Sequence, residues 1–174
     1  MDKLSFQSQD CEITLSDGLE EYRAYLRANG KKQLTDAPGS QVIRDHDATH
    51  VIFGLDTSIE QESMLDSWVL SATSWKLKQL LAYNQLPELK QLTKDFRNDP
   101  GYLRLILTAV KLIPIKLKIW KRSKQMNKKW PFASPDHLMD QRICDLRKEY
   151  GIKILTPDER KGKKPLIWSG TIKN

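Results

Sequence analysis

Apolar residues at helical spacing constrain the fold of this 174-residue chain more than any other feature. The clearest example follows Thr57 and Glu60, which have the spacing of a capping box at the start of a helix. The apolar residues then recur at i, i+3, i+4, i+7 and i+10: they are Leu65, Trp68, Val69, Ala72 and Trp75. This pattern predicts a helix that begins near Thr57 and reaches about Asn84, before Pro87.

Other segments carry helix signals and are bounded by a glycine, a proline or a capping residue. They are 18–29 after a cap at Ser16 or Asp17, 41–53 before Gly54, 88–96, and 134–151 with Pro135 in its first turn. In the stretch 102–120 we expect a kink or break at Pro114. No alternation typical of strands is long enough to build a sheet, except an ambiguous run at 115–119.

These patterns predict an all-α fold. The length suits a single-domain helical bundle over residues 1–174. We expect its core to cover about 16–152, with an irregular tail at 153–174.

The charge of the chain is distributed unevenly. The formal net charge is +7, and every charged residue from Arg104 to Lys129 is Lys or Arg. Apolar residues alternate with these cations too closely to leave about twenty uncharged residues, so the stretch cannot span a bilayer but can lie on one. The N-terminal segment lacks the apolar core of a signal peptide and is too acidic for a transit peptide. We therefore expect a cytoplasmic protein that binds membranes peripherally.

The basic stretch offers candidate residues for lipid and for the membrane surface. The candidate lipid contacts are Trp68, Leu103, Ile106, Leu107, Val110 and Trp120. The candidate contacts with anionic headgroups are Lys116, Lys118, Lys121 and Arg122. The alternative is a core helix with solvated lysines. A nucleic acid is the rival partner, but no nucleic-acid-binding motif accompanies the basic residues, and we expect none to bind.

Two of the three histidines lie between Arg44 and Glu62, among acidic residues. Each residue of an α-helix advances by about 100°, so Asp47 lies at about 100° and His50 at about 40° when His46 is taken as zero. All three side chains then leave one face of the predicted 41–53 helix.

Glu62 can join these side chains only if the chain folds back, because a straight helix would place it about 18 Å from His50. Gly54 and a cap at Thr57 or Ser58 allow an antiparallel helix hairpin that brings them to similar height. The predicted metal ligands are His46, Asp47, His50 and Glu62. The alternative is a set of solvated side chains beside a half-buried His50.

Two imidazoles with carboxylates suit zinc, and they also suit a 2-His-1-carboxylate iron site. We expect a divalent metal, with zinc favoured and iron or magnesium as alternatives. A zincin protease needs Glu where Asp47 stands and a third ligand downstream. A His-Asp metal phosphohydrolase needs a further histidine upstream of His46, and none is present.

The pattern H-D-x-x-H-x(11)-E, from His46 to Glu62, resembles that of the coenzyme Q (ubiquinone) biosynthesis protein 4 family. The segment 145–152, DLRKEYGI, is similar to the ending of that family's last helix. The resemblance covers roughly 18–152. In that family an arginine- and tyrosine-rich segment precedes the motif, and here only Arg44 represents it. The family's upstream "LP…TLG" segment is not recognisable in this sequence.

The resemblance implies an α-helical protein at a membrane surface, with the metal beside an apolar lipid cavity for a polyprenyl tail. It implies a polyprenylated quinone precursor as ligand and oxidative decarboxylation at ring C1 as the supported reaction. The alternative is a non-enzymatic scaffold that binds lipid and organises other quinone-biosynthesis enzymes, with a homodimer as one form of the assembly. Substrate turnover would discriminate between the two.

Overall fold

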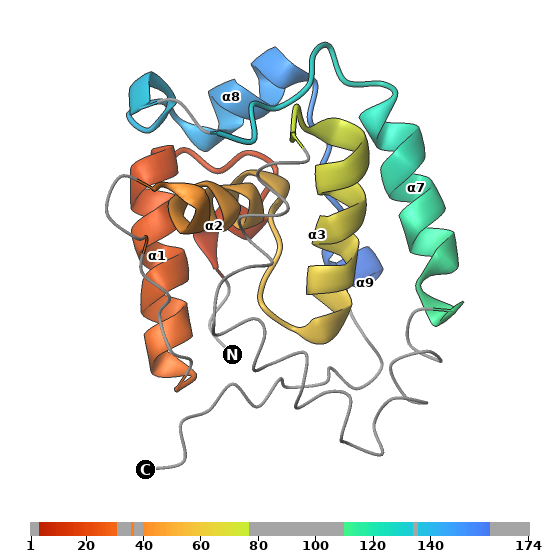
Figure 1. Ribbon diagram of the computed structural model, residues 1–174, viewed down its shortest axis with the longest axis horizontal. Helices are drawn as coiled ribbons and strands as arrows, with labels where there is room; N and C mark the ends of the chain where they lie inside the picture. The colour runs from red at the N-terminus through yellow and green to blue at the C-terminus, as the bar shows by residue number, and fades with distance from the viewer. Residues whose placement is uncertain (1–3, 31–35, 37–39, 77–109, 134–135, 161–174) are drawn as a thin grey trace.

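The computed structural model describes residues 4–30, 36, 40–76, 110–133 and 136–160 (Figure 1). Its helices, in chain order, are η1 (Ser5–Gln7), α1 (Leu15–Ala28), α2 (Val42–Phe53), α3 (Ile59–Ala72), α7 (Ile113–Ser123), η2 (Asp136–Leu138), α8 (Ile143–Tyr150) and α9 (Pro157–Arg160), where η marks a 3-10 helix. Pairing of the β type within the described residues is limited to two isolated bridges, Thr14 with Arg142 and Thr73 with Trp130. The predicted all-α class is confirmed for these residues.

The helix starts differ slightly from the predicted ones. Helix α1 begins earlier than expected, because Thr14 and Asp17 form a reciprocal capping box in which each side chain accepts the other's backbone N–H. The cap of α3 is Ser58, whose hydroxyl accepts the N–H of Gln61. The prediction of Ser16 or Asp17 for the first cap is therefore wrong by two or three positions. Of the two residues named for the second cap, Ser58 is confirmed and Thr57 is not.

Helix α3 is shorter than the apolar periodicity predicted. It ends at Ala72, and the backbone of Thr73 is extended and pairs with Trp130. The N–H of Ser74 donates to the carbonyl of Trp130, so the chain leaves the helix to make this contact. The predicted continuation is wrong through Lys76, and its remainder to Asn84 lies outside the described residues.

The C-terminal helices are also divided differently. Helix α7 begins at Ile113 with Pro114 in its first turn, where proline needs no helical N–H partner, and the ambiguous run at 115–119 is helical. The predicted helix over 134–151 consists of η2 and α8. They are separated because the carbonyls of Met139 and Gln141 accept backbone N–H groups from the start of α1 instead. The predicted 88–96 helix lies outside the described residues.

The hydrophobic core extends beyond the expected 16–152 range. Leu4, Phe6 and Cys11 belong to the buried cluster at one end of the chain, and Ile154 and Leu155 belong to it at the other. The part of the tail before residue 161 is therefore packed. Residues 153–156 have no regular secondary structure, as expected, but the short helix α9 follows them. Residues 161–174 lie outside the described residues.

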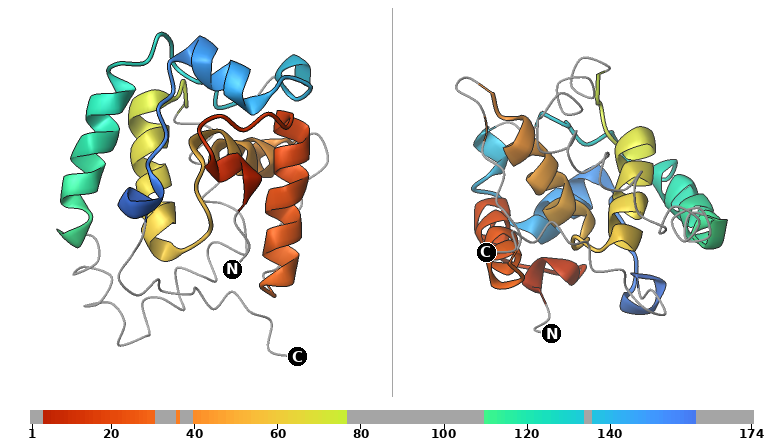
Figure 2. Two further views of the ribbon diagram at one scale, coloured as in Figure 1. Left: turned by 180° about the vertical axis from the view of Figure 1, so that it is seen from behind. Right: turned by 60° about the horizontal axis from the view of Figure 1, so that its bottom comes forward.

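Helices α3 and α7 pack side by side, and α2 packs against both α1 and α3 (Figures 1 and 2). Gly18 allows the close approach of α1: a Cβ at this position would lie 2.7 Å from Cγ1 of Val51 in α2 and 2.8 Å from Cδ1 of Ile143 in α8. A larger residue would require the Val51 and Ile143 side chains or the helices that carry them to shift. Helix α2 is thereby held between α1 and α3.

Arg147 of α8 fixes the C-terminal end of α2. Its side chain is fully buried, and its guanidinium donates to the carbonyls of Val51 and Ile52, at 3.0 and 2.9 Å. It also donates to the N-terminal segment, at the carbonyls of Phe6, Ser8 and Gln9. A cation at a helix C-terminus satisfies the last carbonyls and interacts favourably with the helix dipole. Arg147 thus joins the two ends of the chain to the helix that carries both clustered histidines.

Candidate metal centre

A tight turn joins α2 to α3 and sets the relative position of their side chains. Gly54 adopts a left-handed conformation with φ of 68°, and the N–H of Leu55 donates to the carbonyl of His50 at 2.9 Å, as in a Schellman motif. Asp56 and Gln61 then close the turn, since each side chain contacts the other and Gln61 also accepts the N–H of Asp56. The predicted helix hairpin is present, and its turn is held by side chains as well as by backbone.

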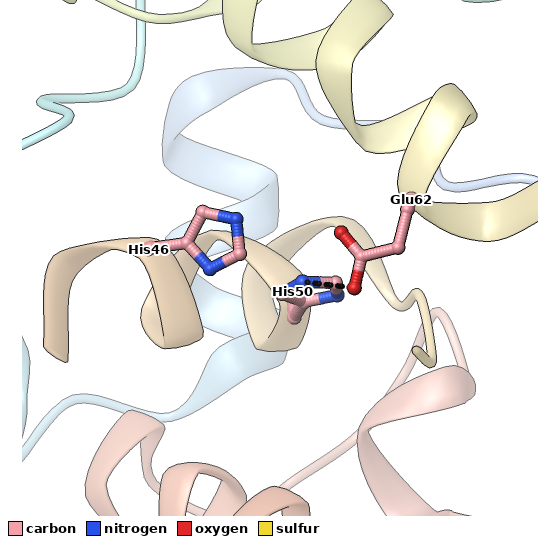
Figure 3. A group of neighbouring side chains, drawn as sticks. All are labelled: His46, His50 and Glu62. Atoms are coloured by element: carbon pink, nitrogen blue, oxygen red, sulfur yellow. Dashed lines mark ion pairs between the residues drawn. The ribbon is translucent and has the colours of Figure 1, made fainter. Parts of the chain in front are cut away.

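The hairpin brings together His46, His50 and Glu62, as Figure 3 shows. One potential ligand atom from each residue lies within 4.8 Å of those of the other two. Nε2 of His50 is 3.5 Å from Oε1 of Glu62. Two ligands bound tetrahedrally to zinc at about 2.1 Å lie about 3.4 Å apart, so this pair already has a suitable separation. The three side chains form a candidate site for a metal ion.

His50 gives the clearest sign that the group suits a cation. It is fully buried, and neither ring nitrogen has a hydrogen-bond partner among the described residues. The contact with Glu62 at 3.5 Å does not have hydrogen-bond geometry. A buried polar atom without a partner costs about 1–3 kcal/mol. Coordination of one ring nitrogen by a metal would remove part of that cost, so the residues present fit a divalent ion.

The ionisation of the two histidines differs. Burial and repulsion by His50 lower the pKa of His46 to about 4, so its lone pair is available near neutral pH. Burial is the largest single effect on His50 and opposes its charged form, but Glu62, Asp47 and the backbone at Leu55 together outweigh it and raise the pKa of His50. A bound cation would compete with that proton for the same nitrogen. The carboxylate of Glu62 lies in the first turn of α3, where the helix dipole favours negative charge.

Asp47 is separate from the three-residue group. Its Oδ2 lies 3.4 Å from Nε of Arg23 in α1, and the side chain is largely buried. Burial raises its pKa to about 6, against the opposing effects of His50 and Arg23. Asp47 lies about 100° round α2 from His46, and its carboxylate pairs with Arg23 of α1 instead of joining the group around Glu62. The structure brings together three of the four predicted ligands.

Tyr22 contacts the site and was not identified from the sequence. Its ring stacks on His50 with centroids 4.8 Å apart and planes 23° apart, and it meets Phe6 edge to face. The spacing of Leu19, Tyr22 and Leu26 marked Tyr22 only as a core position of α1. No local pattern connects α1 with the imidazole of α2, since the contact depends on how the two helices pack.

The described candidate lipid contacts lie in different surroundings. Trp68 is fully buried and stacks on Phe53 with centroids 4.8 Å apart, so it is a core residue. Val110 and Trp120 are about half exposed and lie on the outer side of the molecule. Leu103, Ile106 and Leu107 lie outside the described residues. The lipid cavity and the contacts assigned to it stay predictions.

The four candidate headgroup contacts fall into two pairs. Lys118 and Arg122 bind Glu159 of α9, at 3.1 and 3.0 Å, and Arg122 also donates to the carbonyl of Ile154. These two cations therefore hold the C-terminal segment against α7. Lys116 and Lys121 lie on the same helix, and Lys121 is exposed. No helix in the described part of the chain has the length and apolarity that a membrane span needs.

Comparison of the chain with protein-family models, with curated proteins and with solved structures produces no match in any of the three. The indications of function are the geometry of the site and the sequence motif. Both centre on His46, His50 and Glu62.

Proposed function

We propose that this protein binds a divalent metal, zinc in the first instance, through His46, His50 and Glu62. The observation that carries the proposal is the buried His50, whose ring nitrogens lack hydrogen-bond partners and whose Nε2 faces a carboxylate at 3.5 Å. Zinc sites with three protein ligands leave a position for water or substrate. Such an ion would supply Lewis acidity to an oxygen of a bound ligand.

The proposed role is that of a coenzyme Q biosynthesis protein 4-like protein. The support is the motif H-D-x-x-H-x(11)-E, whose two histidines and glutamate lie together across the hairpin. The proposed ligand is a polyprenylated hydroxybenzoate, with its carboxylate directed to the metal position. The supported reaction is C1 oxidative decarboxylation, in which the bond from ring C1 to the carboxylate breaks and CO2 leaves. One atom of dioxygen becomes the new ring hydroxyl, and a separate electron donor supplies the two electrons that, with two protons, reduce the other atom to water.

The residues of the chain have distinct parts in this proposal. His46 and Glu62 complete the ligand set with His50, while Tyr22 holds the plane of the His50 ring. The Asp47–Arg23 pair ties the same helix to α1. A His-Asp phosphohydrolase is disfavoured, because Asp47 is outside the group and the third histidine, His137, is an exposed residue of η2.

Elemental analysis of the purified protein, with mass spectrometry of its organic extract, tests the proposal. We expect about one divalent metal per chain and a prenylated aromatic compound in the extract. Glu62→Ala should weaken metal binding, because a site of two imidazoles alone binds zinc less tightly. This effect is expected although Glu62 lies on a different helix from the two histidines. Full metal occupancy in the Glu62→Ala protein would refute the three-residue site.

Turnover of a polyprenylated hydroxybenzoate by the metal-loaded protein distinguishes the enzyme from a scaffold. Release of CO2 that depends on His50 supports the catalytic role. The opposite outcome is a protein that is fully occupied by metal and lipid and shows no turnover when dioxygen and an electron donor are present. That result supports the role of a non-enzymatic scaffold.

A further inference from the structure

The two cysteines of the chain lie close together, although they come from remote parts of the sequence. Cys11 belongs to the segment before α1, and Cys144 belongs to the first turn of α8. The backbone N–H of Cys144 donates to the carbonyl of Cys11 at 2.9 Å. With standard bond lengths, this contact limits the separation of the two Cα atoms to about 6.8 Å at most. Disulfides span Cα separations of about 4.4–6.8 Å, so the backbone spacing suits one.

Backbone pairing fixes the segment before α1 against the start of α8 (Figures 1 and 2). Thr14 and Arg142 form an antiparallel bridge. The N–H of Ile143 donates to the carbonyl of Ile13 at 3.0 Å, next to the contact between the cysteines. The closeness of the two cysteines is therefore set by the fold, because the neighbouring residues hold the same register.

Arg147 indicates which way Cys144 faces. The two residues are three positions apart on α8, so their side chains leave the helix about 60° apart. The guanidinium of Arg147 donates to the carbonyls of Ser8 and Gln9, which lie just before Cys11. Cys144 is therefore on the side of α8 that meets the segment containing Cys11.

The two thiols differ in their access to solvent. Cys11 is 5% exposed, whereas Cys144 is half-buried, and both are free. Burial raises the pKa of the Cys11 thiol, although the N–H of Ile13 and the charge of Arg147 oppose it. Cys11 is thus mainly protonated near neutral pH. Arg142 and Arg147 interact with a charge on the Cys144 sulfur, and cations beside a partly exposed thiol are typical of reactive cysteines.

We propose that Cys11 and Cys144 are a redox-active pair that a hydroperoxide converts into a disulfide. The thiolate of Cys144 attacks one oxygen of hydrogen peroxide, the O–O bond breaks, hydroxide leaves, and Cys144 becomes a sulfenic acid. The sulfur of Cys11 then attacks the sulfur of Cys144, an S–S bond forms, and the sulfenic oxygen leaves as water with the proton of Cys11. Overall, two thiols are oxidised by two electrons and one peroxide is reduced to two waters.

The disulfide would join the segment before α1 covalently to α8. That segment also carries Phe6, whose ring meets Tyr22, and Tyr22 stacks on His50. Oxidation would therefore fix the segment that supports the Tyr22 ring, and a thiol reductant would release it. The inference rests on the two cysteines and does not depend on the proposed metal site.

Oxidation of the purified, fully reduced protein with hydrogen peroxide tests the proposal. After alkylation of the remaining thiols, we expect a monomer that has lost two hydrogen atoms and carries no alkyl group in its intact mass spectrum. Peptide mapping should find Cys11 joined to Cys144, and dithiothreitol should restore both thiols. The urea midpoint of the oxidised monomer should lie above that of the reduced one, because the linkage closes a long loop in the unfolded chain.

A matched pair of serine variants tests the order of the two steps. Cys11→Ser should give a sulfenic acid at Cys144 that dimedone traps, because the second thiol is missing. Cys144→Ser should react with peroxide at least about tenfold more slowly than Cys11→Ser, because its remaining thiol is buried and protonated. Neither variant should show a higher urea midpoint after peroxide treatment. Circular dichroism checks that both keep the helical content of the wild type.

The urea-unfolded wild-type chain is the control for the geometry. Once Cys144 is oxidised, the linkage should form at least about tenfold more slowly there, because a long flexible loop must first close. Equal rates in the folded and unfolded chains would overturn the proposal. So would a folded protein in which Cys144 is oxidised while Cys11 stays free, or disulfides that form only between two chains. The same experiment on His50→Ala should give the wild-type result, so a failure of the metal site does not affect this test.

Discussion

At the scale of single residues, His50 and Asp47 illustrate how neighbours on one helix acquire different environments. His50 is buried under Tyr22 and directed towards Glu62, with no hydrogen bond to either ring nitrogen. Asp47 is largely buried as well, but Arg23 offsets its charge. The first arrangement leaves a ligand atom in need of a partner, and the second does not.

The two residues should therefore respond differently to substitution. We expect His50→Ala to lose the bound metal, because one imidazole and one carboxylate form a much weaker zinc site. Asp47→Asn should keep most of it, since the Asp47 carboxylate is outside the ligand group. The metal content of both purified variants, measured by mass spectrometry, checks this. Equal losses in the two variants would mean that Asp47 is a fourth ligand.

At the scale of secondary-structure elements, the junction of α7 and α9 depends on one carboxylate. Glu159 accepts hydrogen bonds from the backbone N–H of Thr156 and from the side chains of Lys118 and Arg122. Partial burial opposes the charged form, but these donors outweigh it and lower the pKa of Glu159 from 4.5 to about 2. The lowered pKa means that the folded state favours the carboxylate more than the unfolded state does.

This gives a pH dependence with a defined sign. The contribution of Glu159 to stability is fully present above about pH 4.5 and is lost as the pH falls towards about 2, because the unfolded state then binds a proton first. We expect the free energy of unfolding to fall more steeply across that range in the wild type than in Glu159→Gln. Urea denaturation at several pH values measures both. Parallel curves would contradict the assigned role.

The elements also show what the sequence can and cannot predict. The hairpin was predictable because its signals are local in the sequence. Gly54 ends α2 in a left-handed backbone conformation, and Glu62 closely follows the residue that caps α3. The end of α3 and the split between η2 and α8 were not, because backbone groups of distant segments replace the helical hydrogen bonds there. The pairing of Asp47 with Arg23 was missed for a similar reason, since it depends on how α1 crosses α2.

At the scale of the whole molecule, Arg147 connects parts of the chain that are remote in sequence. The segment 145–152, which contains Arg147, resembles a family sequence, but nothing in it indicates that the guanidinium is buried. Burial lowers its pKa to about 10, which still leaves it charged at neutral pH. The cost of burying this charge is offset by hydrogen bonds to backbone carbonyls at the end of α2 and in the N-terminal segment.

Replacing Arg147 should be costly even when the charge is kept. Arg147→Lys leaves several buried carbonyls without donors, because an ammonium cannot reproduce the planar fork. We expect a loss of about 3 kcal/mol or more in the free energy of unfolding. Arg142→Lys is the matched control: its side chain is 55% exposed and pairs with an exposed Asp145, so its loss should be about 0–1 kcal/mol. Urea denaturation of both variants measures the difference, and equal small losses would refute the role of Arg147.

The contacts of Arg147 also affect the order of events during synthesis. The hydrogen bond from its guanidinium to Phe6 joins residues 141 positions apart. At about 5–20 residues per second, a ribosome adds Arg147 several seconds after Glu62. His46, His50 and Glu62 are therefore all synthesised while the last carbonyls of α2 still lack their donor. A premature stop after codon 62 and before codon 147 would retain every proposed ligand and still produce a chain that cannot complete its core.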